Sequence, residues 1–384
     1  MARMRFGRTL LVLGVTALLS APVAFVLGET SAAATRVVKL QDLPALESIL
    51  GQLAGKRVVY VGESHDRYDH HLNQLAVIER MHAASPDLAI GVEFFQQPFQ
   101  PHLDAYIRRE IDTTEMLART EYFRRWQFDF RLYAPILAYA RSHGIPVIAL
   151  NVPTELTSKV GQNGLESLTA EERASLPKNI DRSDADYRAR LERIFRQHAG
   201  SEKRDFDRFV DVQLLWDEGM AARAAEYLRA NPSRRMVVLA GTGHLAYGAG
   251  IPSRLGRRVP VTSAIVLQGG GIELSPDIAD FVLLSEERRL PPAGTLGVVL
   301  EPVDGVHIAG FAEESAAQTA GLRRHDQIVA VDGRPVGSVA DVKALLWDKS
   351  PGERVKVTVS RGFFDPSEQQ FEVELRAHQK AGDK

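Results

Sequence analysis

The segment Val58-Val59-Tyr60-Val61-Gly62-Glu63-Ser64-His65 determines how the first half of the chain folds. It starts as a continuous apolar run without alternation, which is typical of a strand buried on both faces of a parallel sheet. The run passes at once into a small residue, a carboxylate and an imidazole. Open parallel sheets bind ligands beyond the carboxyl ends of their strands. Glu63 and His65 therefore lie where catalytic and binding residues are usually found.

Further apolar runs follow, and helical patterns separate them. We expect strands at Val58–Val61, Ala89–Phe94, Pro146–Leu150, Met236–Ala240, Thr262–Leu267 and Phe281–Leu284. Apolar residues recur at helical spacing in 70–83 and 205–229. The polar stretch 154–204 is expected to be a helical insertion that forms a cap or lid. This order predicts an α/β domain with a mostly parallel sheet and helices on both faces.

Polar side chains stand at the ends of other expected strands too. Glu93 closes the second strand, Asn151 follows the third, and His244 lies just after the fourth. We therefore expect Glu63, His65, Glu93 and His244 to converge as catalytic residues, because carboxylate and imidazole can act as general acid and base on a water. His65, Glu93 and His244 are alternatively ligands of a divalent metal such as Zn or Mn. Taken singly, each has a simpler interpretation as a helix cap or a backbone hydrogen-bond partner.

Three more polar residues lie on helices near this cluster. His70 and His71 begin the helix after the first strand, and we expect both to be exposed to solvent. Asp217 lies on an otherwise apolar helix face. It needs an arginine or histidine partner, because an unpaired buried charge is costly.

The segment from Tyr122 to Tyr133 is dense in aromatic rings for a chain that is only 7% aromatic. Rings at this spacing are most often core packing. The alternative is a site for a flat anionic ligand, with arginines on its carboxylates. Tyrosine is also an axial ligand of haem iron. Tyr122, Tyr133 and Arg125 are therefore candidates for cofactor binding.

Length and composition limit the remaining functions. The chain has 384 residues, which is more than a single core usually reaches and favours two domains after any leader. A net charge of -2 argues against a nucleic-acid partner. The absence of cysteine excludes disulfides, thiolate metal sites, thiol nucleophiles and lipidated cysteine. Metal or haem ligation must therefore use His, Glu or Tyr.

The first residues have the pattern of a targeting segment. Residues 3–8 carry three arginines, an uncharged run covers 9–28, and small residues lead to Ala34. A basic start, an apolar middle and a small-residue end predict a secretory signal peptide over 1–34, and export to the periplasm or cell envelope. The run approaches the roughly 20 residues of a spanning helix, so a retained N-terminal membrane anchor is the alternative.

The tail differs in character from the domain expected over 35–287. Residues 293–378 read as short strands with two short helices, and alternation at 355–360 marks a half-buried strand. We expect a small β-rich domain there, after a linker at 288–292. The last residues, 379–384, are expected to be disordered.

Motifs of the larger domain, taken together, resemble a known family. They are Gly62-Glu63-Ser64-His65, Gly91-Val92-Glu93, Trp126-x-Phe128-Asp129 with Tyr133-Ala134-Pro135-Ile136-Leu137, Ala149-Leu150-Asn151-Val152-Pro153, Asp217-Glu218-Gly219-Met220-Ala221 and Gly241-Thr242-Gly243-His244. In this order they resemble the ChaN-like haem-binding uptake family, which is similar in core fold to erythromycin esterases and the TraB/Tiki proteins. The resemblance implies an envelope homodimer that binds cofacial haem through tyrosine, for iron uptake or haem handling. In the esterase and Tiki relatives Glu and His at these strand ends support hydrolysis, so an esterase or peptidase is the alternative.

The tail resembles a bacterial PDZ domain of the HtrA type. The resemblance rests on Thr295-Leu296-Gly297-Val298, on the segment 314–322 and on the turn at Pro351-Gly352-Glu353. It implies that Leu296, Gly297 and Val298 bind the terminal carboxylate of a peptide or protein C-terminus, which adds a strand to the sheet edge. The alternative is a PDZ fold used only for packing within the chain or for dimerisation.

Overall fold

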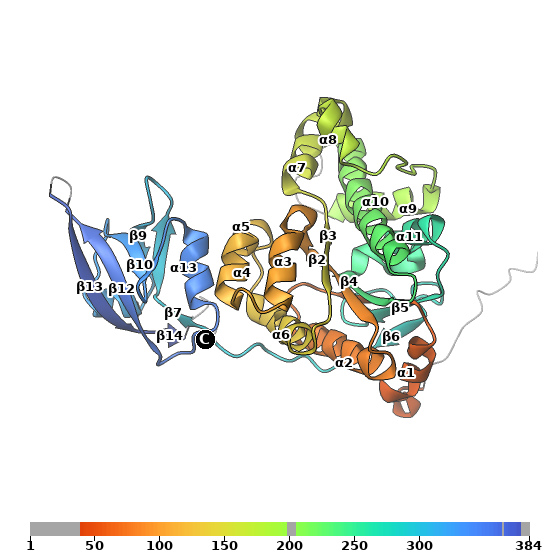
Figure 1. Cartoon of the computed structure of the whole chain (residues 1–384), viewed down its shortest axis with the longest axis horizontal. Helices are drawn as coiled ribbons and strands as arrows, with labels where there is room; N and C mark the ends of the chain where they lie inside the picture. The colour runs from red at the N-terminus through yellow and green to blue at the C-terminus, as the bar shows by residue number, and fades with distance from the viewer. Residues whose placement is uncertain (1–38, 198–204, 363–364, 378–384) are drawn as a thin grey trace, which may run out of the picture. The chain divides into compact units, whose positions relative to one another are not determined.

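The computed structural model describes residues 39–197, 205–362 and 365–377 (Figure 1). In the unit that ends at Pro44, the structure describes the 3-10 turn η1 (Leu40–Asp42). The expected leader at 1–34 and the expected disordered end at 379–384 lie outside the described residues. No helix in the described ranges combines the length and apolar character needed to cross a membrane.

Six parallel strands form the first sheet, in the order β3-β2-β4-β1-β5-β6. They are β1 (Val58–Glu63), β2 (Leu88–Gln96), β3 (Val147–Asn151), β4 (Arg235–Gly241), β5 (Ser263–Gln268) and β6 (Phe281–Leu283). Each expected strand is present, which confirms the predicted parallel sheet. Every residue of β1 and β2 is buried, as expected for strands covered on both faces.

Alternate residues of the strands contribute to two apolar cores. Val59 and Val61 of β1 pack with α2 and the helices from α3 to α6, whereas Val58 and Tyr60 pack with α10 and α11 (Figure 1). The helices are α1 (Glu47–Ala54), α2 (Tyr68–Ala84), α3 (Gln100–Ile107), α4 (Thr113–Arg119), α5 (Tyr122–Arg125), α6 (Ala134–His143), α10 (Phe206–Ala230) and α11 (Ile251–Arg258). Short 3-10 turns are η2 (Gln97–Phe99), η3 (Phe130–Leu132), η6 (Thr242–His244) and η7 (Ala246–Gly248).

The insertion between β3 and α10 is helical, as predicted, as far as residue 197. It contains α7 (Thr154–Asn163), η4 (Leu165–Ser167), α8 (Ala170–Ala174) and α9 (Ala185–Gln197). The long helix α10 lies close against the chain that follows β3. A Cβ atom at Gly219 of α10 would overlap a γ-methyl of Val152, so this close approach requires glycine.

The C-terminal region forms a separate antiparallel sheet in the order β13-β12-β10-β9-β8, with β11 paired to β10 and β14 paired to β7. Its elements are β7 (Gly294–Thr295), β8 (Val298–Glu301), β9 (His307–Phe311), α12 (Ala316–Thr319), β10 (Gln327–Val331), β11 (Arg334–Pro335), α13 (Val339–Leu346), β12 (Arg354–Arg361), β13 (Ser367–Glu374) and β14 (Arg376–Ala377). It has its own apolar core, centred on Ile308, Ile328 and Val357. The predicted small β-rich domain is therefore confirmed, and β8 forms one edge of its sheet.

Candidate functional site

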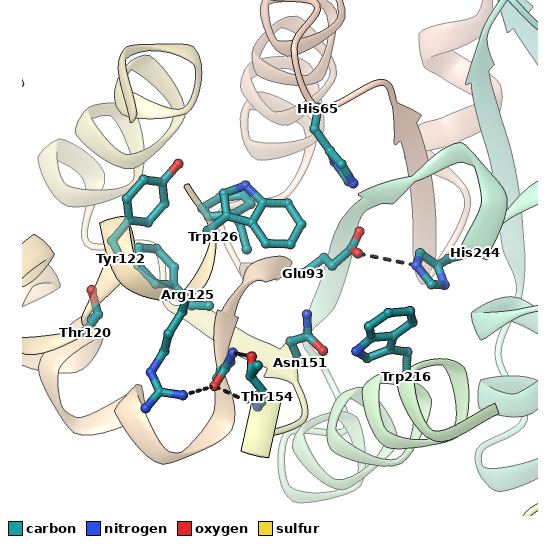
Figure 2. A pocket seen from close by; sticks show the side chains of 13 residues that line it. His65, Glu93, Thr120, Tyr122, Arg125, Trp126, Asn151, Thr154, Trp216 and His244 are labelled. Atoms are coloured by element: carbon teal, nitrogen blue, oxygen red, sulfur yellow. Dashed lines mark hydrogen bonds and ion pairs between the residues drawn. The ribbon is translucent and has the colours of Figure 1, made fainter. Parts of the chain in front are cut away.

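A cavity of about 240 Å³ lies at the carboxyl ends of β2, β3 and β4 (Figure 2). The chain after β1, the short helix α5 and α10 complete its walls. Its lining residues are His65, Glu93, Phe94, Phe95, Gln96, Thr120, Tyr122, Arg125, Trp126, Asn151, Thr154, Trp216 and His244. Figure 2 shows that His65, Glu93 and His244 point toward one another. These three predicted catalytic residues therefore share one site.

Glu63, the fourth predicted catalytic residue, lies directly behind His65. Its Oε1 atom is 2.6 Å from Nδ1 of His65, and its Oε2 atom is 3.3 Å from Nε2 of His71. Gln74 in turn contacts Nδ1 of His71 at 3.1 Å, so α2 holds the carboxylate from behind. This arrangement leaves Nε2 of His65 for the cavity. Burial lowers the pKa of His65, but the hydrogen bond and charge of Glu63 outweigh burial, so the net pKa is raised.

A second chain of polar contacts passes through Glu93. The Gly241 N–H donates to Glu93 Oε2 at 2.7 Å, and Glu93 Oε1 lies 3.3 Å from Nε2 of His244. On the other side of the imidazole, Nδ1 is 2.6 Å from Oδ1 of Asp217. The Tyr187 hydroxyl donates to Asp217 Oδ2 at 2.6 Å. The expectation that Asp217 has a charged partner is confirmed, and that partner is His244.

The two members of this pair shift each other's ionisation. Burial raises the pKa of Glu93, but the charge and hydrogen bond of His244, the charge of His65 and the Gly241 N–H outweigh it and lower the pKa to about 2. Burial likewise lowers the pKa of His244, but the charges of Glu93 and Asp217 outweigh it and raise the pKa well above its ordinary value. At neutral pH His244 is therefore an imidazolium between two carboxylates, and His65 carries the nitrogen free to exchange a proton.

The expectation that His70 and His71 are exposed is wrong. Each side chain is 1% exposed. The chain between β1 and α2 folds back over both rings, so that Nδ1 of His70 accepts the Ser64 N–H at 3.0 Å while His71 contacts Glu63. These histidines position the loop that carries His65.

The residues predicted to bind a cofactor lie at or behind the cavity wall, where Tyr133 and Arg125 have polar partners and the buried Tyr122 hydroxyl has none among the described residues. Tyr122 and Tyr133 are each 1% exposed, and burial raises the pKa of both hydroxyls well above the usual value. Arg125 donates to Glu155 and Glu121, so its guanidinium is already paired. The cavity is also smaller than the roughly 300–1,000 Å³ pockets that enclose small ligands. A haem does not fit within this cavity as the structure has it.

Metal binding by His65, Glu93 and His244 finds no support. Within the described ranges, no group of three or more His, Asp or Glu is placed to hold a metal ion. Both nitrogens of His244 already face carboxylates, Nε2 toward Glu93 and Nδ1 toward Asp217.

The sequence did not predict the roles of Gln96, which lines the cavity, and of Tyr187, which contacts Asp217. Gln96 continues β2 past Glu93, where the register with β3 shifts, and its side chain contacts Thr154 and Arg125. Tyr187 comes from the helical insertion, and only the packing of α9 on α10 reveals its contact with Asp217. Asn151 was noticed at its strand end, and its buried Oδ1 has no hydrogen-bond partner among the described residues. An unpaired buried acceptor in a cavity wall suits a ligand with a donor group.

The C-terminal domain carries a second candidate site. In the loop at Leu296 and Gly297, both carbonyl groups are already hydrogen-bonded. Leu296 O accepts from the Ala317 N–H, and Gly297 O accepts from the Ala312 N–H. In the described part of the chain, the N–H groups of Leu296 and Gly297 have no acceptor. Gly297 has φ +67°, a conformation that favours glycine. The loop thus presents free N–H groups beside the edge strand β8, as a carboxylate-binding loop requires.

Comparison with known proteins gives two family matches. The family described as "Haem-binding uptake, Tiki superfamily, ChaN" matches residues 49–255, more than half of the chain. A PDZ domain matches residues 294–375.

Individual relatives are distant. "Protein RETICULATA-RELATED 5, chloroplastic" of Arabidopsis thaliana is 22% identical over 253 residues, which are 56% of this chain and 31% of that protein. "Serine protease Do-like HtrA" of Lactobacillus helveticus is 36% identical over 58 residues, which are 15% of this chain and 14% of that protein. The chain thus spans about a third or less of the length of these curated relatives. A structure of ChaN from Campylobacter jejuni, described as binding haem cofacially, has a TM-score of 0.51 at 16% identity, over 62% of this chain and 91% of that one. It shows a shared fold.

We predict that His244 stays protonated at neutral pH, because Glu93 and Asp217 stabilise the imidazolium and raise its pKa well above the ordinary value. Its 15N imidazole chemical shifts should report the charged form there, and Asp217→Asn should lower its pKa. Since the folded-state pKa lies above 6.5, the stability from this contact is fully present below about pH 6.5 and is lost as pH rises through the folded value.

Asp207→Asn is the matched control for this titration, because Asp207 lies on the same helix but pairs with Arg188 at the surface. It should leave the His244 titration unchanged. A His244 that titrates near its ordinary pKa in the wild type would contradict the assignment.

Proposed function

Because this chain belongs to the ChaN family of haem-binding uptake proteins within the Tiki superfamily, we propose that its parallel-sheet domain binds haem and that its PDZ domain binds peptide C-termini. The observation that carries the proposal is the family match over residues 49–255. The fold shared with a ChaN described as binding haem cofacially supports it. The basic and apolar pattern of residues 1–34 further supports an exported protein of the periplasm or envelope, concerned with iron uptake or haem handling.

The haem would not occupy this cavity. A porphyrin exceeds the cavity of about 240 Å³, and the hydroxyls of Tyr122 and Tyr133 do not reach solvent. We therefore place haem against the surface of the domain, where a second copy of the chain covers its outer face and excludes water. This arrangement explains why a cofacial pair would require a homodimer.

Haem titration of the full chain tests this proposal. A Soret band should appear and saturate at about one haem per chain at micromolar concentration, and light scattering should show a dimer with haem bound. Tyr122→Phe and Tyr133→Phe should keep the haem affinity within about threefold, because both hydroxyls are buried. Absence of a Soret change at about 10 µM haem would refute haem binding. Loss of the band in either variant would instead show that the buried tyrosines become accessible.

A second function, hydrolysis of a small ester or peptide, is favoured by the paired histidines of the cavity. His65 has Glu63 on Nδ1 and a free Nε2, which suits a general base that removes a proton from water. His244 holds Glu93 in its ionised form beside His65, because the two nitrogens of the imidazolium face Glu93 and Asp217. The unpaired amide oxygen of Asn151 suits a donor group of the substrate. The cavity of about 240 Å³ would accept only a small reacting group.

The hydrolase is tested by Glu63→Gln, which should lower kcat/KM for ester substrates by about 10²–10⁴-fold without loss of fold. Activity of the wild type should rise with pH through the raised pKa of His65, and the variant should shift this profile to lower pH. Glu79→Gln is the control, because Glu79 is an exposed residue of the same helix that carries His71. Equal activity of Glu63→Gln and the wild type would remove this candidate.

The PDZ proposal is tested by fluorescence anisotropy with the full chain. A peptide with a free C-terminal carboxylate should bind at least about tenfold more tightly than its amidated form, because a charged carboxylate accepts stronger hydrogen bonds from the loop N–H groups than a neutral amide does. Gly297→Ala should abolish the difference, since the new Cβ would lie 3.0 Å from Cα of Ser315 and strain a positive φ. Gly337→Ala, which meets only ordinary contact, should bind like the wild type. Equal binding of both peptide forms would favour a PDZ fold used for packing alone.

A further inference from the structure

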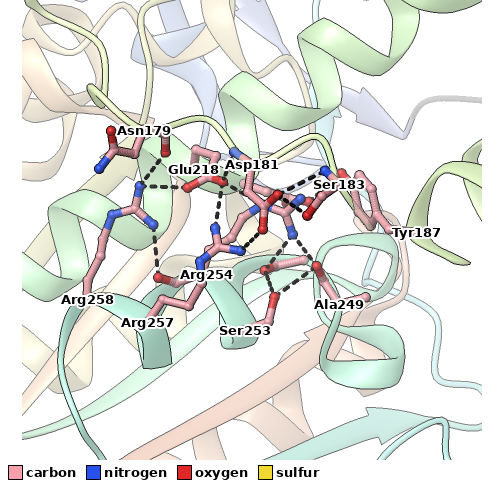
Figure 3. A network of polar contacts seen from close by, with 12 residues as sticks. Asn179, Asp181, Ser183, Tyr187, Glu218, Ala249, Ser253, Arg254, Arg257 and Arg258 are labelled. Atoms are coloured by element: carbon pink, nitrogen blue, oxygen red, sulfur yellow. Dashed lines mark hydrogen bonds and ion pairs between the residues drawn. The ribbon is translucent and has the colours of Figure 1, made fainter. Parts of the chain in front are cut away.

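A second polar cluster surrounds Glu218, the residue after Asp217 in α10. Glu218 has no exposed surface, and three arginines from the end of α11 approach its carboxylate (Figure 3). The distances are 2.6 Å from Arg258 Nη2, 2.8 Å from Arg257 Nη2 and 3.3 Å from Arg254 Nε. The cluster and the cavity at the strand ends share no lining residue, so the cluster is not part of that cavity.

The cluster has more positive than negative charge. Two carboxylates, Glu218 and Asp181, face the three arginines. Glu218 also accepts the N–H of Asp181 at 3.0 Å, so its oxygens are held in place from two directions. A buried carboxylate needs such partners, and the pairing fixes the arginine side chains in turn.

Two of these arginines also line an open pocket of about 540 Å³, together with Lys178 and Arg229. Asp181 is the acidic residue of this lining. In the described part of the chain, neither Lys178 nor Arg229 has a carboxylate within 4.0 Å. We call this hollow, with its cations Lys178, Arg229, Arg257 and Arg258, the arginine pocket. Four cations and one carboxylate therefore face the same open space.

We propose that the arginine pocket binds a phosphate group, carried by a small organic molecule or by a lipid headgroup. The guanidinium fork pairs with phosphate oxygens through parallel N–H donors, and a phosphate monoester brings up to two negative charges to neutralise the excess. The pocket volume falls within the range of about 300–1,000 Å³ that holds small-molecule ligands, so it has room for the organic part beyond the phosphate.

A purely structural role explains only part of the cluster. Arg257 and Arg258 lie in the last turn of α11, where cations are favoured by the helix dipole, and both neutralise Glu218. The helix-dipole reason also applies to Arg229, which lies in the last turn of α10 and donates to the Arg258 carbonyl at 2.7 Å. Neither reason applies to Lys178, which approaches from the helical insertion. Four cations and a single carboxylate line the pocket, so a bound anion would reduce the repulsion between the cations.

The test is calorimetry on the full chain with inorganic phosphate, glycerol 3-phosphate and citrate at matched ionic strength. We expect phosphate and glycerol 3-phosphate to bind with Kd at or below about 1 mM, and citrate at least about tenfold more weakly. Lys178→Gln/Arg229→Gln should weaken phosphate binding at least about tenfold, and circular dichroism should show an intact fold, because neither side chain supports Glu218. Arg173→Gln/Arg193→Gln removes the same charge from exposed positions on α8 and α9 and should stay within about twofold.

Vesicle flotation identifies the source of the phosphate. Binding to phosphatidic acid vesicles but not to phosphatidylcholine vesicles, lost in Lys178→Gln/Arg229→Gln, would support the proposal with a lipid headgroup as the ligand. The proposal is overturned if neither soluble phosphate at about 10 mM nor phosphatidic acid binds. It is also overturned if both double variants weaken binding equally, or if citrate binds as tightly as phosphate. None of these outcomes depends on whether haem binds elsewhere.

Discussion

The carboxylate of Glu93 is the group on which the site depends. It is removed from water at the end of a buried strand, where an unpaired charge would cost several kcal/mol. It stays ionised because the Gly241 N–H and the imidazolium of His244 stabilise it together. That requires β4 to lie beside β2 and the turn after β4 to bring His244 over the strand end. The ionised state of Glu93 thus depends on the strand order, which brings Gly241 and His244 beside it.

Helix α10 connects this site to the rest of the domain through two consecutive carboxylates. Successive residues of a helix point about 100° apart. Asp217 therefore reaches His244 while Glu218 reaches the arginines of α11. Gly219, the next residue, allows the helix to approach Val152 closely. This one short stretch fixes the imidazole, organises the arginine pocket and positions the helix on the sheet.

Local pattern predicted the strands and the convergence of Glu63, His65, Glu93 and His244, because parallel strands place their carboxyl ends at one edge. Local pattern did not predict how deeply side chains outside the sheet are buried. His71 was expected in solvent, yet the loop after β1 buries it against Glu63. Whether a helix start is exposed or buried depends on how the neighbouring loop folds over it and on distant residues such as Tyr133, whose ring centre lies 4.4 Å from that of His71.

The sequence by itself determined the α/β order, the separate PDZ domain and the residue types available at the strand ends, since periodicity and motifs are local properties of the chain. Only the tertiary structure decided which partner each group has. Asp217 pairs with His244, the hydroxyls of Tyr122 and Tyr133 are sealed from solvent, and three arginines surround Glu218. The physical reason is that charge state and accessibility depend on neighbours within a few ångströms, which the packing of distant segments brings together.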